Sequence, residues 1–319
     1  MTAQEPKQIA ILIPCYNEEI TIGSVIDSFH IELPEALIYV YDNNSTDNTA
    51  RIAQEHGAIV RFEPRQGKGN VIRQMLRDIN ADYYVLVDGD GQHPPETVHE
   101  LLKPLQENYA DIVIGDRLTN QSYRRENKRI FHLFGNNTVR LLIGFLYNTR
   151  ISDALTGYRA MNRHFAKTLP ILSKGFEIEV EMYIHAVDKN WRIVEVPIET
   201  RSRPEGSISK LSTIRDGLKV LAAILSLFKD YRPLVLFTFI GSVLVLAGIL
   251  FGVPVILEFF QTSLVERFPT AILAVGLVLS GLLSLTCGIV SDTVVKSYRK
   301  QYELEVFKES RDAQKEQTK

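Results

Sequence analysis

The chain has 319 residues, which leaves room for more than one domain. Its formal net charge is −2, so no global basic field points to a nucleic-acid partner, and we expect none. Its two cysteines, Cys15 and Cys287, match neither a metal-site spacing nor a disulfide framework, which favours reduced thiols and a catalytic part facing the cytoplasm.

Strand and helix patterns alternate from the N-terminus to the fourth predicted strand. Apolar runs bounded by polar turns predict the strands, and amphipathic segments between them predict the helices. This alternation is typical of βαβ units and implies a largely parallel sheet covered on both faces. The first three strands are expected at 9–14, 37–41 and 58–62, each followed by a helix, the second of which is expected at 49–56.

The fourth predicted strand ends in two carboxylates. Residues 83–87 are five consecutive apolar or aromatic side chains, which indicates a buried strand, and Asp88-Gly89-Asp90 follows at once. Open α/β sheets bind ligands at the edge where their strands end. Two carboxylates this close can converge on one divalent cation, with the side-chain oxygen of Gln92 nearby. The alternative is an acidic turn, because Asp and Gly are ordinary turn residues.

Polar side chains also follow the first two strands, at 14–18 and 42–47, and the βαβ topology should bring all three segments to one crevice. Neither the G-x-G-x-x-G fingerprint of dinucleotide-binding folds nor the G-x-x-x-x-G-K-[ST] sequence of a P-loop occurs at these strand ends. Gly67-Lys68-Gly69 predicts a flexible loop whose cation suits a position beside a phosphate. Taken alone, that loop is more often a solvated turn.

Four segments together resemble a known family. Ile-Pro-Cys-Tyr-Asn-Glu at 13–18, Asp-Asn-Asn-Ser-Thr-Asp at 42–47 and Asp-Gly-Asp-Gly-Gln-His-Pro at 88–94 are similar to successive motifs of the family 2 glycosyltransferases with a GT-A fold. Ser-Asp-Ala-Leu-Thr-Gly-Tyr-Arg at 152–159 resembles the family's acceptor-side motif. Within the family, the chain looks like the polyprenyl-phosphate glycosyltransferases, which include dolichyl-phosphate mannose synthase and bacterial undecaprenyl-phosphate glucosyl and N-acetylglucosaminyl transferases. The resemblance implies a Rossmann-like GT-A domain that moves a sugar from a nucleoside diphosphate to a lipid phosphate.

The same resemblance implies roles for single residues. Asn43 stands where the family often has a second Asp, so this position has lost a charge. UDP is the carrier that the resemblance favours, and Mg²⁺ or Mn²⁺ is the implied cofactor. The implied nucleotide-sugar ligands are Pro14, Tyr16, Glu18, Asp42, Lys68, Asp88, Gly89 and Asp90, and the implied metal ligands are Asp88, Asp90 and Gln92.

The acceptor side needs cations, because two phosphate groups repel each other at close range. The resemblance makes Asp153 the candidate base, with Asp90 as the second catalytic residue. The second pKa of a phosphate monoester is about 6, so the acceptor is already largely anionic and hardly needs a strong base; Asp153 would instead orient Arg159 or the acceptor. From the residues alone, Asp153 and Arg159 predict an ion pair that steadies a loop. The candidate acceptor-phosphate ligands are Arg117, Arg159, Arg203 and Lys210.

A helix is expected to open near Glu177, directly after a glycine and a phenylalanine. Glu179 or Glu181 in its first turn would reach the acceptor pocket. Alternatively, the three acids form a solvated helix start, where negative charge is favourable. Both interpretations fit the pattern.

Two long apolar runs predict a membrane hairpin. Residues 233–257 and 269–291 carry no charge over a length that can cross a bilayer, and two buried helices of a soluble core would explain such long runs less well. Basic residues flank the hairpin on both sides, so the positive-inside rule places both termini in the cytoplasm. Amphipathic patterns at 124–147 and 211–231 predict helices at the membrane surface, although the first would also suit packing on the sheet. Apolar and acidic residues alternate at 302–306, which predicts a strand added to a sheet edge, in this chain or in a second copy of a homo-oligomer.

The expected fold class is α/β, with a mostly parallel GT-A sheet domain, juxtamembrane amphipathic helices and a transmembrane hairpin. The expected activity is metal-dependent, inverting transfer of one sugar, glucose or N-acetylglucosamine being favoured, from a UDP-sugar to polyprenyl (undecaprenyl) phosphate, for cell-envelope glycans or protein glycosylation at the cell (inner or plasma) membrane. The alternatives are the same fold with a hydroxyl acceptor and a non-catalytic nucleotide-sugar-binding membrane protein. The expected parts are the GT-A domain at 1–210, an amphipathic helix at 211–232, the transmembrane pair within 233–291 and a cytoplasmic tail at 292–319.

Overall fold

The computed structural model describes residues 7–118, 140–141, 144, 151–204, 226 and 228–316. The chain divides into two compact units. One unit comprises Met1–Ala223 together with Val306–Lys319, and the other comprises Ile224–Glu305. The two cysteines, one in each unit, are free thiols, as expected.

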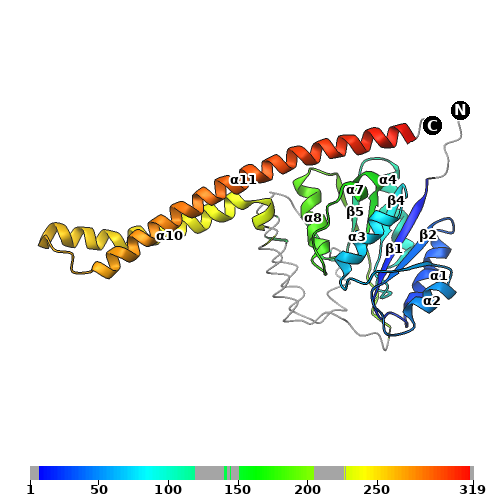
Figure 1. Cartoon of the computed structure of the whole chain (residues 1–319). Helices are drawn as coiled ribbons and strands as arrows, with labels where there is room; N and C mark the ends of the chain where they lie inside the picture. Colours follow the sequence, from blue (N-terminus) through cyan, green and yellow to red (C-terminus); the bar gives the residue numbers. More distant parts are fainter. Residues whose placement is uncertain are drawn as a thin grey trace. The chain divides into compact units, whose positions relative to one another are not determined.

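The first unit is built on a seven-stranded mixed sheet with the strand order β3-β2-β1-β4-β6-β5-β7 (Figure 1). Neighbouring strands are parallel except where β6 pairs with β4 and β5. Among the described strands, six therefore end at one edge of the sheet, and β6 begins there. This strand arrangement confirms the predicted, mostly parallel sheet. The strands are β1 Ile9–Cys15, β2 Leu37–Asp42, β3 Ile59–Phe62, β4 Tyr83–Leu86, β5 Ile112–Asp116, β6 Arg159–Asn162 and β7 Ile193–Pro197.

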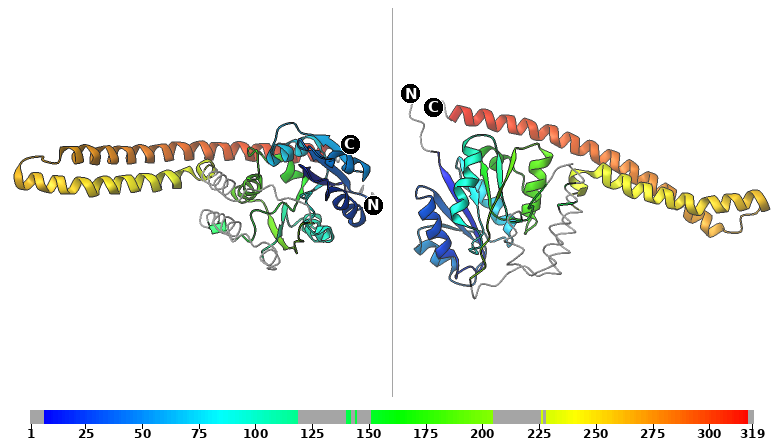
Figure 2. Two further views of the ribbon diagram at one scale, coloured as in Figure 1. Left: turned by 90° about the horizontal axis from the view of Figure 1, so that it is seen from below. Right: turned by 180° about the vertical axis from the view of Figure 1, so that it is seen from behind.

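Helices cover both faces of the sheet (Figures 1 and 2). Side chains alternate between the faces along each strand, so Ile11 and Ile13 of β1 join the core formed with the first set of helices, whereas the second set contacts the opposite face. All four residues of β4 are buried, as expected for a strand covered on both sides. The first set is α1 Ile22–Glu32, α2 Thr49–Glu55 and α4 Val98–Gln106, which the short 3₁₀ helix η1 Pro95–Thr97 precedes; the second set is α3 Lys68–Asp78, α7 Arg163–Thr168 and α8 Ile178–Asp188.

The second unit contains two apolar helices, α10 Pro233–Thr262 and the first part of α11 Phe268–Glu316. They lie side by side (Figures 1 and 2), and small residues allow the close approach: a Cβ atom on Gly241 would lie 2.8 Å from the carbonyl oxygen of Gly281. The Ser284 hydroxyl donates to the Phe237 carbonyl oxygen at 3.0 Å. Both helices are long and apolar enough to cross a membrane, and most of their surface is exposed. The structure thus confirms an apolar helical pair that can form the predicted hairpin.

The predicted strand at 302–306 is wrong, because these residues continue α11. Extending an existing helix adds a hydrogen bond with each residue and requires no new nucleus, and the segment is rich in Lys, Glu, Gln and Arg, which favour helices. The homo-oligomer interpretation rested on this strand and loses its basis. Lys210 and most of the predicted surface helices at 124–147 and 211–231 lie outside the described residues.

Candidate active site at the carboxyl edge

The first carboxylate after β4 belongs to a cluster of four charged or titratable side chains. Lys68, the first residue of α3, forms an ion pair with Asp88 and another with Glu179 of α8, the latter at 2.6 Å from Nζ to Oε1. His93 Nε2 lies 3.6 Å from the second oxygen of Asp88. We call Lys68, Asp88, His93 and Glu179 the Asp88 cluster. One ammonium group in this cluster is therefore shared by two carboxylates from different elements.

Burial and charge act against each other in this cluster. Burial alone would lower the pKa of Lys68, but the carboxylates of Asp88 and Glu179 outweigh it and raise that pKa above its usual value. Burial would raise the pKa of Asp88, whereas Lys68 and then His93 bring it well below its usual range. The pKa of Glu179 is raised, chiefly by burial and in spite of Lys68. Lys68 and Asp88 therefore form a firmly charged pair at the carboxyl edge.

Glycines bring the backbone close to this cluster. A Cβ atom on Gly157, in the loop before β6, would lie 2.2 Å from Oδ2 of Asp88. A Cβ atom on Gly67, whose φ is +124°, would lie 2.2 Å from the Lys174 carbonyl oxygen, which accepts a hydrogen bond from Gly69 N at 3.0 Å. The loop before α3 therefore needs its glycines to pass beneath residues 173–174 and present Lys68.

The second carboxylate, Asp90, is 6 % exposed and contacts the segment after β7. Its Oδ2 forms an ion pair with Arg203, and its Oδ1 accepts from Gln92 N at 3.1 Å. Arg203 Nε also donates to Gln92 Oε1 at 3.3 Å, and Arg201 N donates to the Gln92 carbonyl oxygen at 2.9 Å. Arg203 thus bridges the side chains of Asp90 and Gln92.

The acceptor-side carboxylate has a different partner from the one expected. Asp153 has no exposed surface, and Arg117 binds both of its oxygens, at 2.7 Å through Nε and 3.1 Å through Nη2. Arg159 is also fully buried, and its guanidinium donates to the carbonyl oxygens of Thr156 and Ala154 at 3.1 and 2.9 Å. The expected Asp153–Arg159 pair is therefore replaced by Asp153–Arg117. Arg159 instead holds the loop that carries Gly157.

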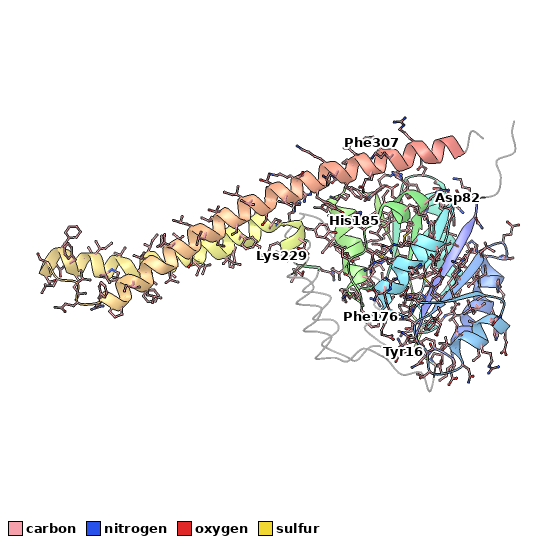
Figure 3. All side chains as sticks on the ribbon, in the orientation of Figure 1. Tyr16, Asp82, Phe176, His185, Lys229 and Phe307 are labelled. Carbon is pink, nitrogen blue, oxygen red and sulfur yellow. The ribbon has the colours of Figure 1, made fainter. Side chains whose placement is uncertain are left out.

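The loops after β1 and β2 interlock on the predicted nucleoside side. Asn17 N donates to Ser45 Oγ at 2.9 Å, and Thr46 N donates to Asn17 Oδ1 at 2.7 Å. Tyr16 is 39 % exposed, and Figure 3 shows it at the same end of the first unit as Phe176, opposite Asp82, which precedes β4. Pro14 and Glu18 are half-buried next to it.

Asp42, at the end of β2, is buried, and its Oδ1 has no hydrogen-bond partner within the described part of the chain. The neighbouring Asn43 is 3 % exposed and donates to the carbonyl oxygens of Glu63 and Arg65 at 2.8 and 2.9 Å. Its Oδ1 accepts from Gly67 N at 2.7 Å. A carboxylate cannot donate these bonds, so Asn43 ties the end of β2 to the loop that presents Lys68.

The sequence left the place of Glu179 open and gave no role to His93. The structure buries Glu179 against Lys68, so the interpretation of these acids as a solvated helix start is wrong. His93 was part of a motif without a role of its own. The signal for Glu179 in the sequence was its place in the first turn of a helix that opens after Gly175 and Phe176. Glu181 is also buried and accepts from Leu172 N and Ser173 N at 3.0 and 2.9 Å.

The donor groups at the edge suit a divalent cation. Within the described residues, no three His, Cys, Asp or Glu side chains gather as a ready-made ligand set. Mg²⁺ and similar ions, however, are commonly held by one or two carboxylates together with substrate phosphates and water. Asp88 and Asp90 provide such carboxylates. Lys68 and Arg203, which pair with them in this structure, would have to move away from these carboxylates or bind other groups when a cation binds.

Comparison with known proteins gives the family. Residues 10–169 match glycosyl transferase family 2. Glycosyltransferase AglJ of Haloferax volcanii is 31 % identical over 93 % of this chain and 96 % of its own length. The UDP-N-acetylglucosamine–dolichyl-phosphate N-acetylglucosaminyltransferase of Methanococcus voltae is 27 % identical over 69 % of this chain and 96 % of its own.

A solved structure agrees with this result. Glucosyl-3-phosphoglycerate synthase from Mycobacterium tuberculosis, in complex with Mn²⁺, UDP-glucose and phosphoglyceric acid, superposes with a TM-score of 0.55 at 25 % identity, covering 69 % of this chain and 79 % of that one. The match spans half of this chain in the family comparison and nearly all of it in the comparison with AglJ. The chain therefore belongs to the family 2 glycosyltransferases.

Proposed function

We propose that this protein transfers one sugar, with inversion, from a nucleoside diphosphate sugar to polyprenyl phosphate at a membrane. UDP is the favoured carrier, and glucose or N-acetylglucosamine is the favoured sugar. Two relatives support the carrier, because one is named for UDP-N-acetylglucosamine and the other was solved with UDP-glucose. The lipid acceptor is supported by the dolichyl phosphate in the name of the Methanococcus relative and by the two apolar helices.

The observation that carries this proposal is the commitment of the edge carboxylates to cations. Asp88 is paired with Lys68, Asp90 with Arg203, and both oxygens of Asp153 with Arg117. A hydroxyl acceptor needs a base to take its proton, whereas a phosphate monoester arrives already anionic. A cation-rich edge whose carboxylates at Asp88, Asp90 and Asp153 are each paired with a cation suits a phosphate acceptor better than a hydroxyl.

The donor would bind with its nucleoside beside Tyr16 and Asp42 and with its diphosphate toward Asp88 and Asp90. Asp88, Asp90 and the side-chain oxygen of Gln92 would hold a divalent cation, which would neutralise charge on the leaving diphosphate. Lys68 lies beside Asp88 and adds a fixed positive charge on the same side. Mg²⁺ and Mn²⁺ both suit such oxygen ligands, and the Mn²⁺ in the solved relative supports a divalent ion here.

The acceptor would be gathered by Arg117 and Arg203. Asp153 holds the Arg117 guanidinium in one orientation, so Asp153 acts by positioning that cation. An oxygen of the acceptor phosphate forms the new bond to the anomeric carbon. The bond from that carbon to the donor phosphate oxygen breaks, and its electron pair leaves with the nucleoside diphosphate. Direct displacement from the opposite face inverts the anomeric centre.

The two apolar helices would cross the membrane and leave both flanks in the cytoplasm. Lys229 precedes α10, and Lys296 and Arg299 follow the apolar part of α11. Placing these basic residues in the cytoplasm satisfies the positive-inside rule. A cysteine introduced at Ser263, between the helices, in a Cys287→Ser background tests this orientation. We expect a membrane-impermeant maleimide to label it from the periplasmic or outer side only, and labelling from the cytoplasmic side only would reverse the assignment.

The central test incubates the purified full-length protein with Mn²⁺ or Mg²⁺, radiolabelled UDP-glucose, UDP-N-acetylglucosamine or GDP-mannose, and either polyprenyl phosphate or the corresponding polyprenol. We expect a lipid-linked product with the phosphate and none with the alcohol. Asp90→Asn should abolish turnover while the protein still inserts into membranes. Transfer to polyprenol, a glycan or a peptide would support a hydroxyl acceptor instead. Donor binding without any product would support a non-catalytic binding protein.

A further inference from the structure

Glu179 has no assigned role in the reaction, yet it is buried at the carboxyl edge. It is 4 % exposed and belongs to the first turn of α8, far in sequence from the loop that carries Asp88. Its Oε1 lies 2.6 Å from Nζ of Lys68, and the same ammonium pairs with Asp88. The geometry is a carboxylate–ammonium–carboxylate chain that connects α8 to the end of β4.

The series of ion pairs from Asp88 through Lys68 to Glu179 matters because Asp88 has two competing partners. In the structure Asp88 binds an ammonium, whereas in the proposed donor complex it binds a divalent cation. Lys68 has little exposed surface, with 9 % of its side chain accessible. Removing one member of a buried ion pair is strongly destabilising, because the remaining charge has no counter-charge. Without a second carboxylate, Lys68 would therefore hold Asp88 back or repel the incoming cation.

We propose that Glu179 is a positioning residue for the donor site, which retains the Lys68 ammonium when Asp88 turns to the divalent cation. This inference rests on the proposed metal-dependent function. Glu179 holds the Lys68 ammonium close to the diphosphate side through their direct contact, and its own contact with the cation is not required. The loop at residues 173–174, hydrogen-bonded to Gly69, keeps the α3 start in place during the exchange.

The test measures Mn²⁺ binding rather than turnover. Binding of Mn²⁺ to the full-length protein in the presence of saturating UDP is followed by electron paramagnetic resonance of the free ion. We expect Glu179→Gln to weaken Mn²⁺ binding by about 10- to 100-fold, the usual effect of losing a residue that supports a metal ligand. In a Lys68→Met background the same substitution should have no further effect, because there is no ammonium left to retain.

Glu181→Gln is the matched control. It makes the same chemical change two residues further along α8, at an equally buried Glu that binds backbone N–H groups instead of Lys68. Its cost should appear in thermal unfolding and should persist in the Lys68→Met background. An unchanged Mn²⁺ affinity in Glu179→Gln, or an equal loss with and without Lys68, would overturn the inference. If the wild-type protein itself bound no Mn²⁺ with UDP, the metal-dependent function would fail instead.

Discussion

Gly157→Ala should separate activity from stability. The added Cβ atom would lie 2.2 Å from Oδ2, 2.8 Å from Cγ and 2.9 Å from Oδ1 of Asp88. Something has to move, and the loop is held on both sides. Arg159 binds two of its carbonyl oxygens, and Gly115 N donates to the Tyr158 carbonyl oxygen at 2.9 Å. The Asp88 carboxylate is the end of a short side chain and is therefore the group that yields.

The displacement sets the size of the effect. Restoring an ordinary contact requires Asp88 to move by about 1 Å, and a misplacement of this size costs on the order of 100-fold in rate. The expected loss in kcat/KM is therefore about 100-fold, or about 2.7 kcal/mol of transition-state stabilisation. The free energy of unfolding should change by no more than about 1–3 kcal/mol, the usual cost of one additional methyl group in a packed site.

The assay compares kcat/KM for transfer from the UDP-sugar to polyprenyl phosphate with thermal unfolding of the same full-length preparations. Gly276→Ala is the control, because a Cβ atom at that position in α11 meets nothing within 4 Å. The control should retain wild-type activity and stability. Activity within about threefold of wild type in Gly157→Ala would refute the reasoning, since that corresponds to only about 0.6 kcal/mol.

Three further substitutions test the acceptor side, the loop after β2 and a buried histidine of α8. Arg117→Lys keeps a positive charge but loses the bidentate contact with Asp153, so the KM for polyprenyl phosphate should rise by about tenfold while the affinity for UDP stays unchanged. A change in the affinity for UDP alone would contradict the acceptor role of Arg117. Asn43→Asp removes two buried donor bonds to backbone carbonyls and should lower the free energy of unfolding by about 1–3 kcal/mol in urea titrations, whereas no loss would mean that these bonds contribute nothing. Burial, with Lys189 nearby, lowers the pKa of His185 to about 3, so between that value and about 6.5 the unfolded chain binds a proton that the folded chain does not. Below about pH 6.5, the free energy of unfolding should therefore fall on acidification by about 1.4 kcal/mol per pH unit more in the wild type than in His185→Gln. Urea titrations at pH 5 and 7 measure this difference, and an equal change in the free energy of unfolding of both proteins between the two pH values would contradict the assignment.

The sequence alone was enough for the first four strands and for the apolar helical pair. Apolar runs at 9–14 and 83–87 predicted buried strands, and the structure has them at Ile9–Cys15 and Tyr83–Leu86. Long runs without charge likewise predicted the apolar pair α10 and α11. These are local properties, since the period of the side chains and the length of a run depend only on neighbouring residues. The rule that parallel strands end at one edge then predicted that Asp88 and Asp90 lie at the carboxyl edge, where they follow β4.

The tertiary structure alone decided which charged groups meet. Asp153 pairs with Arg117 rather than with Arg159 in its own motif, and Glu179 reaches Lys68 across the edge. Such pairs depend on how loops from distant parts of the chain cross, and no period or spacing in the sequence records that crossing. The antiparallel strand β6 escaped prediction for the same reason, because a four-residue strand forms only when β4 and β5 already flank it. Local patterns therefore determined the elements and their edge, while long-range packing determined the electrostatics of the site.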